Sequence, residues 1–153
     1  MTDTTILIFG ASGDLAKRKL IPALYKLFAK KRPQRCVIIG AALEDITAVQ
    51  ILQNTRSFIK NLDEEIWKSF CDHFFYERHN IKSADDYHLL KQKVLILEKK
   101  FNLSGNRIIY CAVAASLYCE LTNQVAQSGI AVRTDAKSPY WHRIVYEKPF
   151  GHN

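Results

Sequence analysis

Residues 4–16 read TTILIFGASGDLA, and this stretch decides the fold of the chain. A short, almost continuous apolar run of this kind is typical of a parallel strand that is covered on both faces. It leads into a loop in which Gly10 allows a sharp turn and Gly13 lets backbone amides approach a phosphate. Ala16 is small enough for the next helix to pack closely on the strand. The pattern G-x-x-G-x-x-A at this place predicts a loop that binds the pyrophosphate of a dinucleotide.

The same pattern has one competing interpretation, a glycine-rich turn that binds nothing. The place of the loop, after an apolar strand and before a lysine-rich helix, favours the nucleotide. A P-loop is excluded, because Leu15 stands five residues beyond Gly10 and no Gly-Lys-Ser/Thr follows.

Beyond this loop, strand-like and helix-like segments alternate along the chain. Apolar, β-branched runs predict strands, and runs with apolar residues three or four apart predict helices. The strands are expected over 4–10, 35–42, 106–114 and 142–149, with a weaker one over 74–79. The helices are expected over 15–32, 45–60, 62–73, 83–100 and 116–128. This alternation predicts a doubly wound α/β domain with a parallel sheet of order 3-2-1-4-5. The binding crevice should lie between strands one and four.

Residues that commonly cap helices mark where four of these helices begin. They are Asp14, Asp45, Ser83 and Ser116. Pro22 falls inside the first helix. Either that helix kinks there, or its main body begins near Leu20 with Pro22 in the first turn.

Composition places the chain among soluble globular proteins, since 48% of its residues are hydrophobic and 24% are charged. The N-terminus has no basic region of a signal peptide, and no apolar run is long enough to span a bilayer. The four cysteines form no CxxC pair and have no metal-ligand spacing. We therefore expect a cytoplasmic protein without a structural metal or disulfides, made as one domain over residues 1–153.

Positive charge is concentrated in one segment, residues 15–35, which holds eight Lys and Arg residues and no acid. The rest of the chain has 14 basic against 15 acidic residues. Such a cluster serves either the phosphates of a small ligand or a nucleic acid. We expect the small ligand and no nucleic acid, with DNA binding as the weaker alternative.

Two motifs at opposite ends of the chain resemble one known family. Residues 8–27, IFGASGDLAKRKLIPALYKL, closely resemble the opening signature of the glucose-6-phosphate dehydrogenases. Residues 145–151, VYEKPFG, resemble the family's V-x-E-K-P-F-G motif. The resemblance implies a Rossmann-like, NADP-binding domain. It also implies an oxidoreductase that, when complete, oxidises glucose 6-phosphate to 6-phosphogluconolactone in the oxidative pentose phosphate pathway.

Carried over by position, the resemblance implies a set of binding residues. The loop residues that would bind the cofactor are Gly10, Ala11, Ser12, Gly13, Asp14, Leu15, Ala16 and Lys17. Tyr118 matches an aromatic position that contacts the cofactor, and Lys148 with Pro149 would lie where cofactor and sugar phosphate meet. Lys148 would hold the substrate, which agrees with its expected place at the carboxyl end of a buried strand. A solvated strand end is the alternative for that lysine.

The sequence departs from the family's pattern in three ways. Leu43 stands where the family has an arginine for the 2′-phosphate of NADP, so NAD is also possible. An acidic residue after the second strand favours an unphosphorylated ribose, and Glu44 is placed for that role; the alternative for this acidic pair is that Asp45 only caps the next helix. Lys17, Arg18 and Lys19 are the remaining cations that could attract the 2′-phosphate. Ala114 and Ala115 replace two prolines. Finally, the family's substrate domain, with its general-base histidine, is expected after residue 153, so no catalytic residue is assigned here.

Two functions follow as hypotheses. The first is the cofactor domain of a glucose-6-phosphate dehydrogenase, acting as a homo-oligomer in the complete enzyme and inactive as this chain alone. The second is a non-catalytic nucleotide-binding protein derived from the family. Neither hypothesis involves a membrane.

Overall fold

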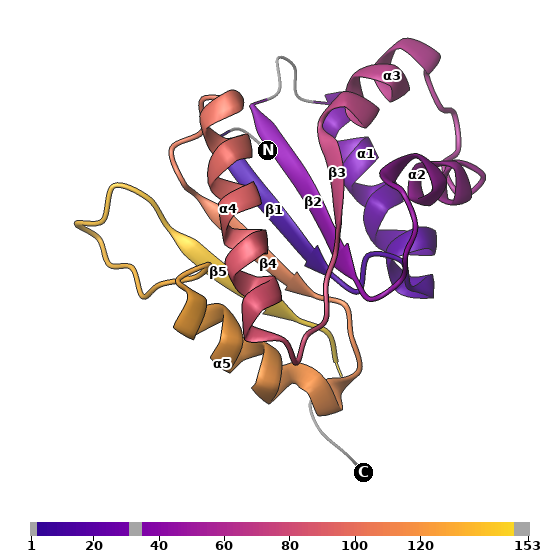
Figure 1. Cartoon of the computed structure of the whole chain (residues 1–153). Coiled ribbons are helices and arrows are strands. Elements are labelled where there is room, and N and C mark those ends of the chain that lie inside the picture. Colours follow the sequence, from indigo (N-terminus) through magenta and orange to yellow (C-terminus); the bar gives the residue numbers. More distant parts are fainter. Residues whose placement is uncertain (1–2, 31–34, 149–153) are drawn as a thin grey trace.

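The computed structural model describes residues 3–30 and 35–148, and its centre is one sheet of five strands (Figure 1). The strands are β1 (Thr4–Phe9), β2 (Cys36–Ala42), β3 (Phe74–Arg78), β4 (Arg107–Cys111) and β5 (His142–Tyr146). They lie in the order β3-β2-β1-β4-β5, and every neighbouring pair is parallel. The doubly wound α/β fold and its strand order are therefore confirmed, and the weak fifth strand candidate is β3 at one edge.

Helices cover both faces of the sheet (Figure 1). One face carries α1 (Ile21–Lys30), α2 (Ala48–Arg56) and α3 (Glu64–Asp72), and the other carries α4 (Ala84–Lys100) and α5 (Tyr118–Ser128). Because side chains alternate along a strand, β1 supplies both cores. Ile6 and Ile8 lie in the first core, and Leu7 and Phe9 lie in the second.

The start of the first helix resolves the place of Pro22. A five-residue π-helical turn, η1 (Ala16–Leu20), comes first, and the Ile21 amide donates to the carbonyl of Ala16 across it. The regular helix α1 begins at Ile21, but residues 14–30 are helical without a break, so Pro22 lies inside a continuous helix, directly after the π-helical turn. The regular helix does begin near Leu20, as the second alternative has it, but Pro22 does not follow a free helix N-terminus.

Three of the four expected helix caps, Asp14, Asp45 and Ser116, are wrong, and one is confirmed. Helix α2 is capped by Thr47, whose hydroxyl accepts from the Gln50 amide while the Gln50 side chain accepts from the Thr47 amide. This reciprocal pair satisfies two amides, which Asp45 cannot do from two residues further out. Ser116 lies within a short 3₁₀ turn, η2 (Ala115–Leu117), and makes no cap. Ser83 caps α4 as expected.

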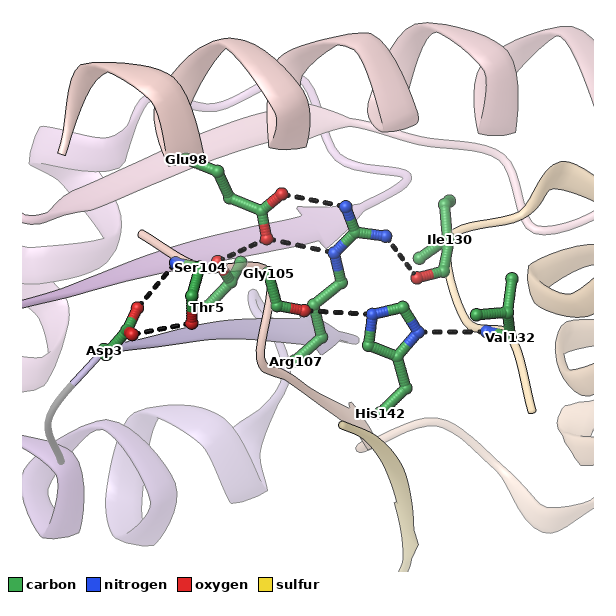
Figure 2. A network of polar contacts seen from close by, with 9 residues as sticks. All are labelled: Asp3, Thr5, Glu98, Ser104, Gly105, Arg107, Ile130, Val132 and His142. Atoms are coloured by element: carbon green, nitrogen blue, oxygen red, sulfur yellow. Dashed lines mark hydrogen bonds and ion pairs between the residues drawn. The ribbon is translucent and has the colours of Figure 1, made fainter. Parts of the chain in front are cut away.

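A buried polar network lies at the N-terminal ends of β1, β4 and β5 (Figure 2). Arg107 makes two hydrogen bonds to Glu98, at 3.0 and 2.8 Å, and a third to the Ile130 carbonyl at 2.7 Å. Thr5 also donates to Glu98, at 2.8 Å. The Glu98 and Arg107 side chains are both buried, so this network has a structural role. It lies at the opposite end of the strands from the glycine loop.

No helix in the described part of the chain is both long and apolar enough to cross a membrane.

Candidate functional site

The glycine loop leaves β1 at the centre of the sheet and is held between the ends of its two neighbours. Gly10 has a φ of +87°, a conformation that side chains disfavour, and its amide donates to the Ala41 carbonyl of β2 at 2.8 Å. On the other side, a Cβ at Gly10 would lie 2.3 Å from the Ala112 carbonyl oxygen, just beyond β4. The loop therefore stands where the winding of the sheet reverses, between β1 and β4, as predicted.

A second glycine under the loop escaped the sequence analysis. Ala11 is buried and faces Gly40 of β2, and a Cβ at Gly40 would lie 2.6 Å from the Ala11 Cβ. The absence of a side chain at Gly40 allows Ala11 of the loop to pack directly against β2. The available signal was a glycine inside an apolar strand, which often marks a close approach of two backbones.

The loop passes directly into the first helical turn. The Gly13 amide donates to the Gly10 carbonyl at 3.0 Å, and the Lys17 amide donates to the Gly13 carbonyl at 3.1 Å. Asp14, expected to cap this helix, instead accepts from Arg18 at 2.8 Å, and that hydrogen bond lowers the pKa of the Asp14 carboxyl. Among the residues that the structure describes, no side chain caps this turn, so its first amides stay available to an anion.

A cleft of about 630 Å³ opens beside the loop. Its lining residues come from the loop, the ends of β2 and β3, and the segment after β4: Gly10, Ser12, Gly13, Ala42, Leu43, Glu44, His79, Asn80, Ile81, Lys82, Ala112, Val113, Ala114 and Leu117. Of the expected loop residues, Gly10, Ser12 and Gly13 face this cleft. Ala11 and Ala16 are buried beneath the loop, where their small size allows the packing.

The wall formed by the end of β2 carries a negative charge. The Ser12 hydroxyl donates to the Glu44 carboxylate at 2.9 Å, which fixes that carboxylate against the loop. Leu43 beside it is exposed. The contact between Glu44 and Ser12 has no signal in the sequence, because the two residues meet only when β2 is in register with β1.

His79, which the sequence analysis left unassigned, lies in the floor of the cleft just after β3. Its side chain is 1% exposed, and neither ring nitrogen has a hydrogen-bond partner among the described residues. The ring packs edge-on against Tyr87, with centroids 4.3 Å apart, and against Phe9. Burial lowers the pKa of this imidazole, with Asp86 acting the other way, so the ring is neutral at physiological pH.

The segment after β4 forms the opposite wall. Ala114, in place of a family proline, has a φ of −59°, which is the value a proline would impose. Tyr118 lies outside the cleft: its hydroxyl donates to the Glu147 carbonyl at 3.1 Å and accepts from the Glu147 amide at 3.3 Å. Its contact with a cofactor stays a prediction.

Lys148 is the last of the described residues. It is exposed, two residues beyond the end of β5, and is not part of the cleft lining. Tyr118 holds the preceding residue by both of its backbone groups, so α5 fixes the chain immediately before this lysine. Pro149 lies outside the described residues. The roles expected for Lys148 and Pro149 stay predictions.

The strand order, the Gly10 turn at its reversal point and the adjoining cleft define a dinucleotide-binding domain of the doubly wound class. The family model described as "Glucose-6-phosphate dehydrogenase, NAD binding domain" matches residues 7–153, and the chain belongs to this family. It therefore carries a site for a nicotinamide dinucleotide.

Individual relatives agree. The glucose-6-phosphate 1-dehydrogenase of Leuconostoc mesenteroides is 32% identical over 97% of this chain, and that of Emericella nidulans is 33% identical over 97%. A solved structure of glucose-6-phosphate dehydrogenase in complex with glucose 6-phosphate superposes with a TM-score of 0.85 at 26% identity, over 99% of this chain and 31% of that one. The chain spans about 30% of the length of the curated relatives that it matches.

Proposed function

We propose that residues 1–153 form one dinucleotide-binding domain, in which the pyrophosphate lies against the loop from Gly10 to Lys17. The observation that carries this proposal is the loop itself. Its backbone is turned by Gly10, pressed onto Gly40, and followed by a helical turn with no side-chain cap. Uncapped amides at a helix N-terminus, beside a cleft of dinucleotide size, favour a bound phosphate.

The complete protein would be a glucose-6-phosphate dehydrogenase, acting in the cytoplasm as a homo-oligomer. The cofactor supplies the hydride chemistry, and the protein positions C1 of the sugar against the nicotinamide. Lys148 would contact the sugar phosphate, and Pro149 would help to place the nicotinamide. The general base would come from the further part that the relatives have. Support comes from the family match and from Tyr118, which fixes the backbone next to Lys148.

The proposed cofactor is NADP, with NAD as the second candidate. The family resemblance favours NADP. The exposed Leu43 and the Glu44 carboxylate held by Ser12 favour NAD, because a carboxylate beside the ribose repels a 2′-phosphate and accepts hydrogen bonds from a 2′-hydroxyl.

Calorimetric titration of the 153-residue chain with NADP and with NAD tests the proposal. Saturable binding of either dinucleotide, lost when Gly13 is replaced by Asp, is the expected result. Failure of both dinucleotides to bind would contradict it and would indicate a degenerate domain. Binding to DNA that weakens steeply with salt would instead support the nucleic-acid alternative.

A further inference from the structure

Side chains of β3 hold the loop after β2 in one conformation. The single proton of the Tyr76 hydroxyl is shared between the carbonyls of Ala42 and Glu44, at 2.9 and 2.6 Å, and Arg78 Nε donates to the Leu43 carbonyl at 3.0 Å. Three consecutive carbonyls of residues 42–44 are thus bonded to the neighbouring strand. The register of the sheet causes this arrangement, because Ala42 lies directly across from Arg78.

We propose that Arg78 binds the 2′-phosphate of NADP, an inference that rests on the proposed function and names its specificity-determining residue. In doubly wound folds, the adenosine ribose lies beside the end of the second strand, and an arginine there accommodates the 2′-phosphate. Position 43 offers only a leucine. Arg78 reaches the same place from β3 and is anchored to the Leu43 backbone.

The geometry leaves Arg78 free for this task. Its Nε is used by the Leu43 carbonyl, while its two terminal nitrogens have no ion-pair or hydrogen-bond partner among the described residues. The side chain is exposed, and with Leu43, Asn80 and Asp86 it lines a pocket of about 290 Å³ next to the main cleft. The edge formed by the two terminal NH2 groups can donate to two oxygens of a phosphate at once.

Two other basic residues near the loop already have an acidic partner. Arg18 is hydrogen-bonded to Asp14 and lies over the Phe58 ring, 4.8 Å from its centroid, and Lys17 is 3.8 Å from the same aspartate. Lys82 lines the main cleft and is the rival cation.

Glu44 opposes Arg78 at this position. Burial raises the pKa of Tyr76 to about 12, the Glu44 charge adds to the increase, and the Arg78 charge acts against it. Because Ser12 holds the Glu44 carboxylate in place, its repulsion of a phosphate persists. Arg78 therefore sets a preference for NADP that Glu44 moderates.

The test compares dissociation constants of NADP and NAD for the 153-residue chain and five variants. Arg78→Gln should weaken NADP binding by about tenfold or more, the usual effect of losing hydrogen bonds to a charged group, and leave NAD within about twofold. Arg78→Lys should have an NADP affinity between those of the wild type and Arg78→Gln, because lysine keeps the positive charge but cannot donate two parallel hydrogen bonds. Glu44→Gln should strengthen NADP binding. Arg133→Gln, an exposed arginine in the segment between α5 and β5, is the matched control and should change neither.

The same Arg78→Gln loss should appear with 2′,5′-ADP and be absent with 5′-AMP, which lacks the 2′-phosphate. The inference is overturned if Arg78→Gln leaves the NADP-to-NAD ratio unchanged, or if Lys82→Gln abolishes the preference in its place. Wild-type binding of NAD alone also overturns it, while dinucleotide binding, and with it the proposed function, survives. Only failure of both dinucleotides to bind the wild type refutes the two together.

Discussion

Replacement of Gly10 by alanine tests whether the turn at the centre of the sheet depends on the absence of a side chain. Two costs combine at this position. An alanine held at a φ of +87° costs about 1 kcal/mol relative to glycine. The new Cβ would also lie 2.3 Å from the Ala112 carbonyl oxygen and 2.8 Å from its carbon, and overpacking of this kind adds about 1–3 kcal/mol. The sum is a loss of about 2–4 kcal/mol from the free energy of unfolding.

Gly129 provides the matched control, because it has a similar φ of +79° but a different neighbourhood. A Cβ there would meet only the Lys91 side chain, whose flexible end can move away. Gly129→Ala should therefore cost only the conformational term, about 1 kcal/mol. Urea denaturation followed by circular dichroism measures both variants. Equal losses in the two variants would refute the argument that the Ala112 backbone closes on Gly10.

Three further predictions concern the rest of the fold. Glu98→Leu leaves the buried Arg107 without its partner and should lower the free energy of unfolding, measured by urea denaturation, by about 3–5 kcal/mol. The double variant Glu98→Leu with Arg107→Met should recover most of that loss. A double variant as unstable as Glu98→Leu alone would contradict this. Burial, followed by the Arg107 charge, lowers the pKa of His142 below its ordinary value of 6.5, and its Nδ1 accepts from the Val132 amide at 3.0 Å. The contribution of neutral His142 to the free energy of unfolding should thus be complete above pH 6.5 and be lost as the pH falls through that value toward the lower pKa of the folded state. His142→Gln should make the free energy of unfolding less dependent on pH in this range. An unchanged pH dependence would exclude His142 as its cause. Thr47→Ala removes the capping box of α2 and should lower the free energy of unfolding by about 1 kcal/mol, while Asp45→Ala should have little effect.

The sheet and its central loop could be predicted because they depend on local pattern. Apolar runs and the glycines at positions 10 and 13 indicate strands and a turn without knowledge of any distant contact. Right-handed crossovers then leave few possible strand orders, and the observed one is among them.

The cleft walls could not be predicted, because they depend on register between strands. Ser12 meets Glu44, and Arg78 meets Leu43, only after β2 is aligned with β1 and β3. A shift of one residue would turn these side chains to the other face of the sheet. His79 likewise has no local signal, since its burial comes from Phe9 and Tyr87, which lie far away in sequence or on another element.

The strand order also determines when the cleft can exist during synthesis. Strand β1 is made first, yet its partner β4 follows about 100 residues later, with Phe9 opposite Cys111. At a translation rate of about 5–20 residues per second, one apolar edge of β1 stays open for roughly 5–20 s on the ribosome. An open edge of this kind is a template for wrong pairing. Because residues from Ala112 to Leu117 form a wall of the cleft, the complete cleft exists only once this segment has emerged, so a dinucleotide can stabilise the chain only from that point on.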